Sequence, residues 1–320
     1  MTTATSAEVK IGALLWPQTD DWASFRDAAI RADRAGVDSL WTWDHLMGIN
    51  GPWTSPIMEG WATLAGWAAV TRHATIGLMV GANTFRNPGL TAKLAVTIDH
   101  ISGGRAILGI GGAWFRREHE GYGIEFGRSV GERLDRLDEA VRLIRGLLDG
   151  RRIELHEGRF YRMRDALLAP LPVNGHLPIL IGGSGPQKTL RTTARYADAW
   201  NTDGTPEQLR ARDAILRERC AEVGRDPDTI ERTATVDVLI RDDAEEARRV
   251  WRAARRGQGS SEDDASLFAG TPERVADGLR STIETGFRHL LVDVMSPYDP
   301  ETLERLPEVR SLLAGTAARR

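Results

Sequence analysis

The 320-residue sequence has little of what secreted, membrane or zinc-binding proteins need. Its single cysteine, Cys220, excludes a disulfide framework and a cysteine-based zinc site. No apolar run approaches the roughly 20 residues that span a bilayer. The first ten residues, MTTATSAEVK, lack the basic and apolar regions of a signal peptide. We therefore expect a cytoplasmic protein without a membrane partner, in which residues 1–8 form a flexible lead-in.

The sequence also lacks an excess of positive charge. Its formal net charge of −3 argues against a nucleic-acid partner, because nucleic-acid-binding domains are usually basic. Neither an H-x-x-x-H nor an H-E-x-x-H spacing occurs, so no catalytic metal is predicted. A hydrophobic fraction of 41% with 27% charged residues is typical of a soluble globular protein. The remaining expectation is an enzyme that acts on a small molecule.

Short apolar runs alternate with longer amphipathic stretches along the chain. The runs predict eight strands, at 11–16, 39–43, 75–80, 106–110, 178–181, 197–201, 233–240 and 289–294. Eight helices are predicted at 21–35, 60–71, 90–101, 130–148, 187–196, 206–223, 243–256 and 272–285. Nearly continuous apolar strands indicate a parallel sheet covered by helices, and the count of eight favours a closed (β/α)8 barrel, a TIM barrel, over an open sheet.

We expect residues 1–320 to form one such α/β domain with two insertions. Residues 113–129 follow the fourth strand, and residues 151–177 precede the fifth. The second insertion contains a predicted hairpin of Arg152–His156 and Arg159–Met163. Long insertions on barrels usually form loops or lids around a site.

The predicted strand ends carry aromatic and ionisable residues, and in such barrels the chemistry lies at the carboxyl ends of the strands. Four tryptophans, Trp16, Trp43, Trp114 and Trp200, lie at or near these ends, which indicates either an aromatic pocket for a heterocycle or simple capping of the barrel mouth. His45 follows Asp44 directly and could bond a ring nitrogen or move a proton; the alternative is a structural histidine. Glu118 and His119 are expected on a loop, where they either touch substrate or face solvent.

A glycine-rich turn, Gly182–Gly185, opens the predicted helix that begins near Pro186. Free backbone N–H groups, the helix dipole and Lys188 together predict a phosphate site; the alternative is an ordinary turn. A nucleotide P-loop is disfavoured, because Gln187 occupies the position of its second glycine. The segment GIGGAW (109–114) likewise fails the dinucleotide pattern, since Trp114 replaces the third glycine.

Several motifs in fixed order resemble the bacterial luciferase-like monooxygenase superfamily, in its actinobacterial branch of F420-dependent oxidoreductases. They are WDH (43–45), EGW (59–61), GLMVGANTFRNP (77–88), DHISGGR (99–105), LGIGGAW with REHEGYG (108–123), ER (132–133) and the segment 178–201. The resemblance implies coenzyme F420, with FMN as the alternative, at the barrel mouth. It also implies a homodimer and a non-proline cis peptide after strand three, here at Gly81–Ala82.

The resemblance further assigns site residues. It implies a cofactor site formed by Asp44, His45, Val80, Gly81, Ala82, Asn83, Gly111, Gly112, Ala113, Trp114, Gly182, Gly183, Ser184, Gly185, Lys188 and Asn201. Some members carry a glutamate just after the strand-four glycines, where this chain has Ala113, Trp114 and Phe115. The nearest acid is Glu118, so His45 and Glu118 are the catalytic candidates.

The expected substrate pocket contains Trp16, Trp43, Trp114 and His119. The favoured activity is F420-dependent hydride transfer to or from a small organic substrate. An FMN-dependent monooxygenase that uses oxygen is the first alternative. The second alternative is a barrel enzyme without a redox cofactor or a protein that only binds a phosphorylated ligand. The predicted phosphate site would serve either equally well.

Overall fold

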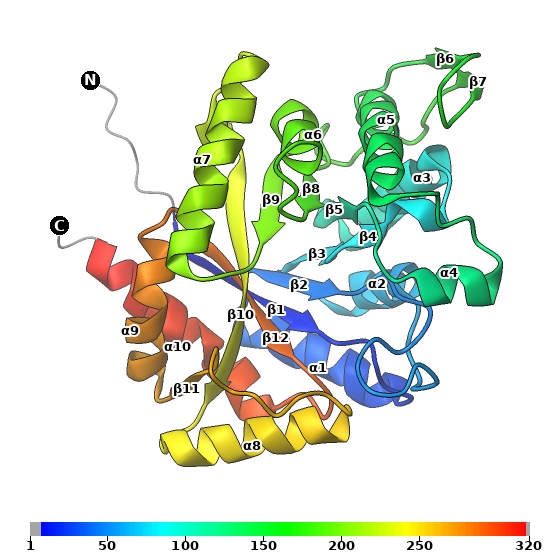
Figure 1. Cartoon of the computed structure of the whole chain (residues 1–320). Coiled ribbons are helices and arrows are strands. Elements are labelled where there is room, and N and C mark those ends of the chain that lie inside the picture. Colours follow the sequence, from blue (N-terminus) through cyan, green and yellow to red (C-terminus); the bar gives the residue numbers. More distant parts are fainter. Residues whose placement is uncertain (1–7, 318–320) are drawn as a thin grey trace.

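Eight parallel strands close into a barrel in the computed structural model, which describes residues 8–317 (Figure 1). The strands are β1 (Lys10–Leu15), β2 (Ser39–Thr42), β3 (Thr75–Leu78), β5 (Ala106–Gly111), β8 (Ile179–Gly182), β9 (Ala199–Thr202), β10 (Glu231–Ile240) and β12 (His289–Val294). Neighbours pair in this order, and β12 returns to β1 in the register Lys10↔His289 to Leu15↔Val294. The predicted (β/α)8 barrel is confirmed, whereas the expected lead-in lies almost entirely outside the described residues.

Helices cover the outside of the barrel (Figure 1). They are α1 (Trp22–Ala35), α2 (Gly60–Val70), α3 (Pro88–Ser102), α5 (Val130–Leu148), α6 (Thr189–Tyr196), α7 (Pro206–Glu222), α9 (Pro272–Ile283) and α10 (Pro300–Ala317). The predicted start of the helix at 187 is wrong, because residues 186–188 form a turn before α6. The helix α10 was not predicted; Pro307 lies inside it and interrupts its helical pattern.

An additional helix, α8 (Ala244–Gly257), packs near the end of β10 rather than in the ring of helices that follow each strand (Figure 1). The three-residue strand β11 (Phe268–Gly270) follows it and extends the sheet beside the last residues of β10. Two 3₁₀ turns, η1 (Asn83–Phe85) and η2 (Pro227–Thr229), and the two-residue strand β4 (Gly81–Ala82) complete the connections. These short elements carry too few residues for a periodic pattern, so the sequence did not predict them.

Both insertions are present, and each has its own local structure. Residues 113–129 contain the helix α4 (Arg116–Tyr122), and residues 151–177 contain the antiparallel hairpin β6 (Ile153–Leu155) and β7 (Met163–Ala166). The second hairpin strand begins where the prediction ended it. The reason is that the N–H groups of Phe160 and Tyr161 donate to the carboxylate of Glu139 on α5 instead of to a strand partner.

The barrel interior is filled with large apolar side chains below the strand ends. Trp41, Leu180 and Leu291 are fully buried there, and Trp16 and Trp43 lie above them towards the carboxyl ends. Because the lower barrel is solid, a ligand can approach only the upper rim. No helix in residues 8–317 has the length and apolarity that a membrane crossing requires.

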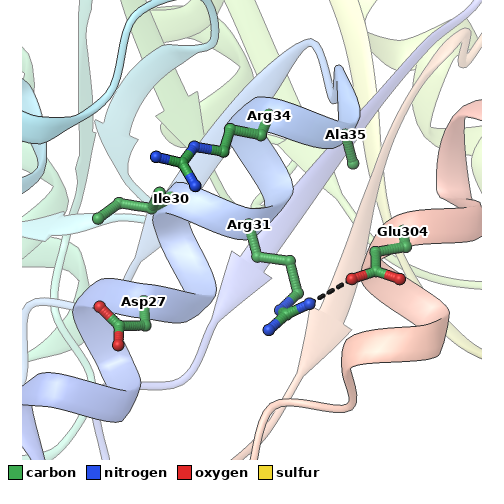
Figure 2. Close-up of a pocket in the computed structure, with 6 residues that line it drawn as sticks. All are labelled: Asp27, Ile30, Arg31, Arg34, Ala35 and Glu304. Carbon is green, nitrogen blue, oxygen red and sulfur yellow. Dashed lines mark hydrogen bonds and ion pairs between the residues drawn. The ribbon is translucent and has the colours of Figure 1, made fainter.

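A hollow of about 520 Å³ lies on the helical exterior between α1 and α10 (Figure 2). Its lining consists of Asp27, Ile30, Arg31, Arg34, Ala35 and Glu304, and an ion pair joins Arg31 to Glu304 across it. The lining comes from two outer helices and from none of the strand ends. This hollow is therefore separate from the predicted site.

Candidate active site

A histidine and a buried carboxylate meet at the carboxyl end of β2. His45 follows that strand, and its Nδ1 lies 3.0 Å from Oε1 of Glu118 on α4. The Glu118 side chain is only 1% exposed and also accepts the backbone N–H of Leu46 at 2.9 Å. Sequence analysis nominated both residues but expected Glu118 on a loop. That location was wrong, because α4 folds back over the strand ends and buries the carboxylate.

This contact fixes which nitrogen of His45 can exchange a proton. An ionised carboxylate only accepts hydrogen bonds, so Nδ1 donates its hydrogen to Glu118 and Nε2 is left for proton transfer. The rings of Trp43, Trp114 and Phe115 surround the imidazole edge-on at centroid distances of 5.5–6.3 Å. Trp114 remains 62% exposed, so its ring face is accessible beside His45.

His119 points away from His45 and is fully buried. Its Nδ1 donates to the carbonyl of Phe115 at 2.9 Å, and its Nε2 lies 2.6 Å from the hydroxyl of Thr84. The rings of Phe85 and Phe126 pack on it, and burial lowers the pKa of its imidazole. His119, which was expected on a loop, thus links α4 to η1 inside the protein. It could contact a substrate only if its hydrogen bond to Phe115 or to Thr84 were broken.

Asp44 diverges from His45 and enters an ion-pair network. Its carboxylate receives Arg86 Nη1 at 2.7 Å and the backbone N–H of Ala82 at 2.9 Å. Arg86 also reaches Glu59 at 2.5 Å. Burial raises the pKa of Asp44, although the charge of Arg86 opposes that rise. Asp44 therefore fixes the backbone of the segment after β3 at Ala82.

Removing Arg86 is expected to destabilise the fold, because Asp44 is completely buried and would lose its counter-charge. Breaking a buried pair by deleting one partner costs about 3–5 kcal/mol. We expect a loss of this size in urea unfolding of Arg86→Leu. Glu59→Gln removes the other, 38% exposed, partner of the same guanidinium and should cost about 1 kcal/mol or less. Equal losses in the two variants would contradict the assigned role of Asp44.

The segment after β3 forms a bulge above the filled barrel. The cis peptide lies at Met79–Val80, so its expected position at Gly81–Ala82 was wrong. Val80 projects over neighbouring strands: a Cβ placed on Gly111 would lie 2.8 Å from it, and one on Gly182 would lie 2.9 Å away. The floor at the ends of β5 and β8 therefore presents one valine and bare glycine backbone. Such a floor suits a flat ring system.

The other predicted cofactor residues are already bonded to protein groups. Asn83 donates to Tyr161 of the second insertion at 3.1 Å, and Asn201 donates to Thr233 at 3.0 Å. Lys188 donates to Asp135 at 2.6 Å and to the carbonyl of Gly131 at 3.0 Å. A phosphate at Lys188 would have to compete with Asp135 for its ammonium group.

The glycine-rich turn lies between α5 and α6. A Cβ on Gly112 would meet Leu134 at 2.8 Å, and Ala113 presents its carbonyl to Arg133. Gly183 has φ of +117°, and its N–H donates to the carbonyl of Asn201. The segments 111–114 and 182–185 thus follow paired strands and lie side by side. The glycine floor and accessible Trp114 fit the ring of F420 or FMN, with these two segments along it.

Sequence analysis missed a pair of carboxyl groups on β10 and β12. Asp237 and Asp293 are register partners, and Trp16 Nε1 donates to Asp293 at 2.8 Å. Burial, together with the charge of Asp237, raises the pKa of Asp293 to about 7. The available signal was a charged residue inside each of two otherwise apolar strands, in VDVLI and LLVDV.

Asp293 should make the stability depend on pH. Its folded pKa of about 7 exceeds the ordinary value of about 3.9, so the folded protein keeps a proton that the unfolded chain releases. The retained proton therefore stabilises the folded protein. This stabilisation is fully present below about pH 4 and is lost as the pH rises through about 7. Relative to wild type, Asp293→Asn should gain unfolding free energy between pH 4 and 8. Urea unfolding at a series of pH values measures this free energy, with Asp20→Asn, at an exposed position, as the control. If the unfolding free energy changed with pH equally in the wild type and both variants, the raised pKa of Asp293 would be refuted.

Comparison with known proteins adds independent information. A family model described as luciferase-like monooxygenase matches residues 1–268. A phthiodiolone/phenolphthiodiolone dimycocerosates ketoreductase from Mycobacterium sp. (strain JLS) is 33% identical over 235 residues, which cover 66% of this chain but only 60% of that protein. An F420-dependent glucose-6-phosphate dehydrogenase from Mycolicibacterium smegmatis is 31% identical over 258 residues, 77% of this chain and 74% of the relative.

A solved structure shares the fold at lower identity. It is an F420-dependent secondary alcohol dehydrogenase in complex with an F420-acetone adduct, with a TM-score of 0.82 and 20% identity over 96% of this chain and 99% of that one. The family match extends past α8 to the first residue of β11 and includes the His45–Glu118 pair and both glycine segments. The chain belongs to the luciferase-like monooxygenase family.

Proposed function

We propose that this protein is an F420-dependent oxidoreductase that interconverts an alcohol and a carbonyl compound. The observation that carries the proposal is the buried Glu118 carboxylate on Nδ1 of His45, beside a bare-backbone floor and the accessible ring of Trp114. The names of the two relatives and of the structural neighbour support the chemistry. A ketoreductase, a glucose-6-phosphate dehydrogenase and a secondary alcohol dehydrogenase all act on a carbon that bears oxygen.

The protein residues would handle the proton and the placement. When bound, F420 supplies or accepts the hydride. In the oxidative direction Nε2 of His45 accepts the hydroxyl proton of the alcohol, and in the reductive direction it returns a proton to the carbonyl oxygen. Glu118 stabilises the imidazolium that forms, because its negative charge lies 3.0 Å from Nδ1. Trp43 and Trp114 shield the imidazole from water on two sides.

Residues that follow β3, β5 and β8, which succeed β2 and His45 in the strand order, would hold the cofactor. Val80, Gly81 and Ala82 would support the ring from beneath, with Asp44 fixing Ala82. Next to this support, two neighbouring segments would line the ring and the tail of the cofactor: Gly111, Gly112, Ala113 and Trp114 after β5, and Gly182, Gly183, Ser184 and Gly185 after β8. Lys188 would serve an anionic group only after leaving Asp135, so we assign the phosphate contact first to the backbone of the glycine turn.

A titration with the two candidate cofactors tests the proposal. We expect F420 to quench tryptophan fluorescence with micromolar affinity and FMN to bind at least tenfold more weakly. Under steady-state conditions, reduction of F420 by a secondary alcohol should then be observable by absorbance. Tight binding of FMN with oxygen-dependent turnover would instead establish the monooxygenase alternative. Binding of neither cofactor, with thermal stabilisation by a sugar phosphate, would favour a barrel enzyme without a redox cofactor.

We further propose that the protein is a homodimer, as the family resemblance implies, and that it lies in the cytoplasm. Light scattering coupled to size-exclusion chromatography tests the mass directly. A particle of twice the 35.3 kDa chain supports the proposal, and a 35.3 kDa particle at micromolar concentration refutes it.

A further inference from the structure

We propose that the guanidinium of Arg117, which lies over the ring of Trp53, binds a carboxylate of the substrate. This assignment, which rests on the proposed function, names the substrate class as an alcohol or ketone that carries a carboxylate. Arg117 lies on α4 directly before Glu118, whose carboxylate contacts His45. Trp53 lies on the connection from β2 to α2, which also carries His45.

One face of α4 packs along this connection. The Cζ atom of Arg117 lies 4.1 Å from the centroid of the Trp53 ring. Residues four apart on a helix share a face, and a Cβ on Gly121 would overlap the end of the Met47 side chain. The carbonyl of Trp53 accepts the N–H of Gly48 at 3.2 Å, so the connection folds back on itself. The Arg117–Trp53 pair therefore lies next to the segment that carries the proton-transfer histidine.

The Arg117 guanidinium has donors to spare. Within residues 8–317 no carboxylate lies at ion-pair distance from it, whereas its neighbour Arg116 faces Glu120 at 3.5 Å. Arg117 is exposed, and Trp53 is 46% exposed. A guanidinium over an aromatic ring keeps its N–H groups in its own plane, where they can bond to a ligand. The ring thus supports the cation while the donors stay open.

The chemistry of these donors favours a carboxylate. Arginine donates two parallel hydrogen bonds to a carboxylate, a geometry that a single hydroxyl or carbonyl oxygen cannot use. The other guanidinium near His45, that of Arg86, is already shared between Asp44 and Glu59. Arg117 therefore adds a positive charge without a counter-charge on this face of α4. A substrate carboxylate at Arg117 would orient the reacting carbon towards Nε2 of His45.

A series of methyl keto acids, each compared with its methyl ester, tests the proposal. The series runs from 2-oxopropanoate to 5-oxohexanoate, with reduced F420 as the hydride donor, so that the spacing between carbonyl and carboxylate varies. For the best-fitting member, kcat/KM of the acid should exceed that of its ester by about ten- to a hundredfold, as expected for a hydrogen bond between charged groups. Raising the salt from about 50 mM to about 500 mM should lower this ratio at least threefold, because exposed charges are screened.

Three variants locate the preference. Arg117→Gln should bring the acid-to-ester ratio close to one, mainly through a higher KM for the acid. Trp53→Leu keeps the cation but removes the ring and should lower the ratio about threefold; an unchanged ratio would contradict the role of the ring. Arg128→Gln is the matched control, because Arg128 lies in the same insertion and its side chain is 93% exposed. It should keep the full ratio.

The acid-to-ester comparison also separates the two sources of an anion. The carboxylate of the substrate and an anionic group of F420 share the chemistry that Arg117 recognises. If Arg117→Gln weakens F420 binding more than tenfold and leaves the acid-to-ester ratio as in the wild type, the anion belongs to the cofactor. That result would overturn the substrate assignment. F420 affinity within threefold of wild type, with the ratio lost, supports it.

Failure of this proposal is distinguishable from failure of the proposed function. If the wild type reduces the esters and the acids equally well with F420, the carboxylate site is wrong and the function stands. If no ketone or alcohol reacts with F420, the proposed function fails. Titration with 4-oxopentanoate, followed by NMR at the indole N–H of Trp53, then tests the site alone. A shift that is absent in Arg117→Gln supports the site, whereas equal shifts or none overturn it.

Discussion

Replacing His45 with glutamine is expected to lower kcat by about 10²–10⁴-fold, because general acid–base catalysis contributes that much. Affinity for F420 should stay within about threefold of wild type, since glutamine keeps a polar side chain of similar length. His45 is the candidate group whose Nε2 is free to exchange a proton while Nδ1 is held by Glu118. Stopped-flow reduction of F420 measures the rate, and fluorescence titration measures the affinity.

Glu118→Gln is the companion variant. The amide can donate to Nδ1, which favours the wrong tautomer of His45 and removes the charge that stabilises the imidazolium. We expect a loss of kcat similar to that of His45→Gln, and a double variant no worse than the more severe single variant, because the two residues act as a unit. His156→Gln, an exposed histidine on the β6–β7 connection, should be unchanged. Activity of His45→Gln within threefold of wild type would rule out its role as proton carrier.

Gly109→Ala is expected to give the largest loss of stability in the chain, at least about 3 kcal/mol or failure to fold. A Cβ on Gly109 would lie 1.8 Å from the backbone carbonyl oxygen of Leu78, and backbone cannot rotate away as a side chain can. The added methyl group would strain the backbone where β5 passes the end of β3, next to Val80. Urea unfolding and the yield of folded protein measure it.

A second glycine supplies the control with the opposite sign. Gly315 lies in α10, and a Cβ there would have no heavy atom within 4 Å. Alanine should therefore stabilise the helix by about 0.5–1 kcal/mol. If Gly109→Ala were as stable as wild type, β5 could not pass β3 as closely as described.

The barrel was predictable because its strands are short apolar runs that are buried on both faces. The helix α5 was predicted at its true bounds, since Leu137, Val141 and Ile144 repeat at helical spacing. The helix α4 was not, because its sequence RREHEGY has no apolar stripe. Its stability comes from the contacts of Glu118 and His119 with other segments, which no local pattern reveals.

The candidate site could be predicted in its residues but not in its pairings. His45 and Glu118 lie 73 positions apart, and Lys188 and Asp135 lie 53 apart. Sequence analysis therefore treated His45 as a lone histidine and Lys188 as a free cation. The position of the cis peptide was displaced by two residues for a related reason: the bulge is set by Val80 packing against Gly111 and Gly182 on other strands.

The adjacency of Glu118 and His119 on α4 has a consequence for how this barrel can diversify. One side chain holds the histidine after β2, and its neighbour holds Thr84 after β4, so a single seven-residue helix carries both the proton partner and its own anchor. Exchanging residues 113–126 between two such barrels would therefore transfer both the carboxylate that contacts the histidine and the side chain that anchors its helix. The loop after one strand can be replaced as a unit while the floor of the barrel stays unchanged.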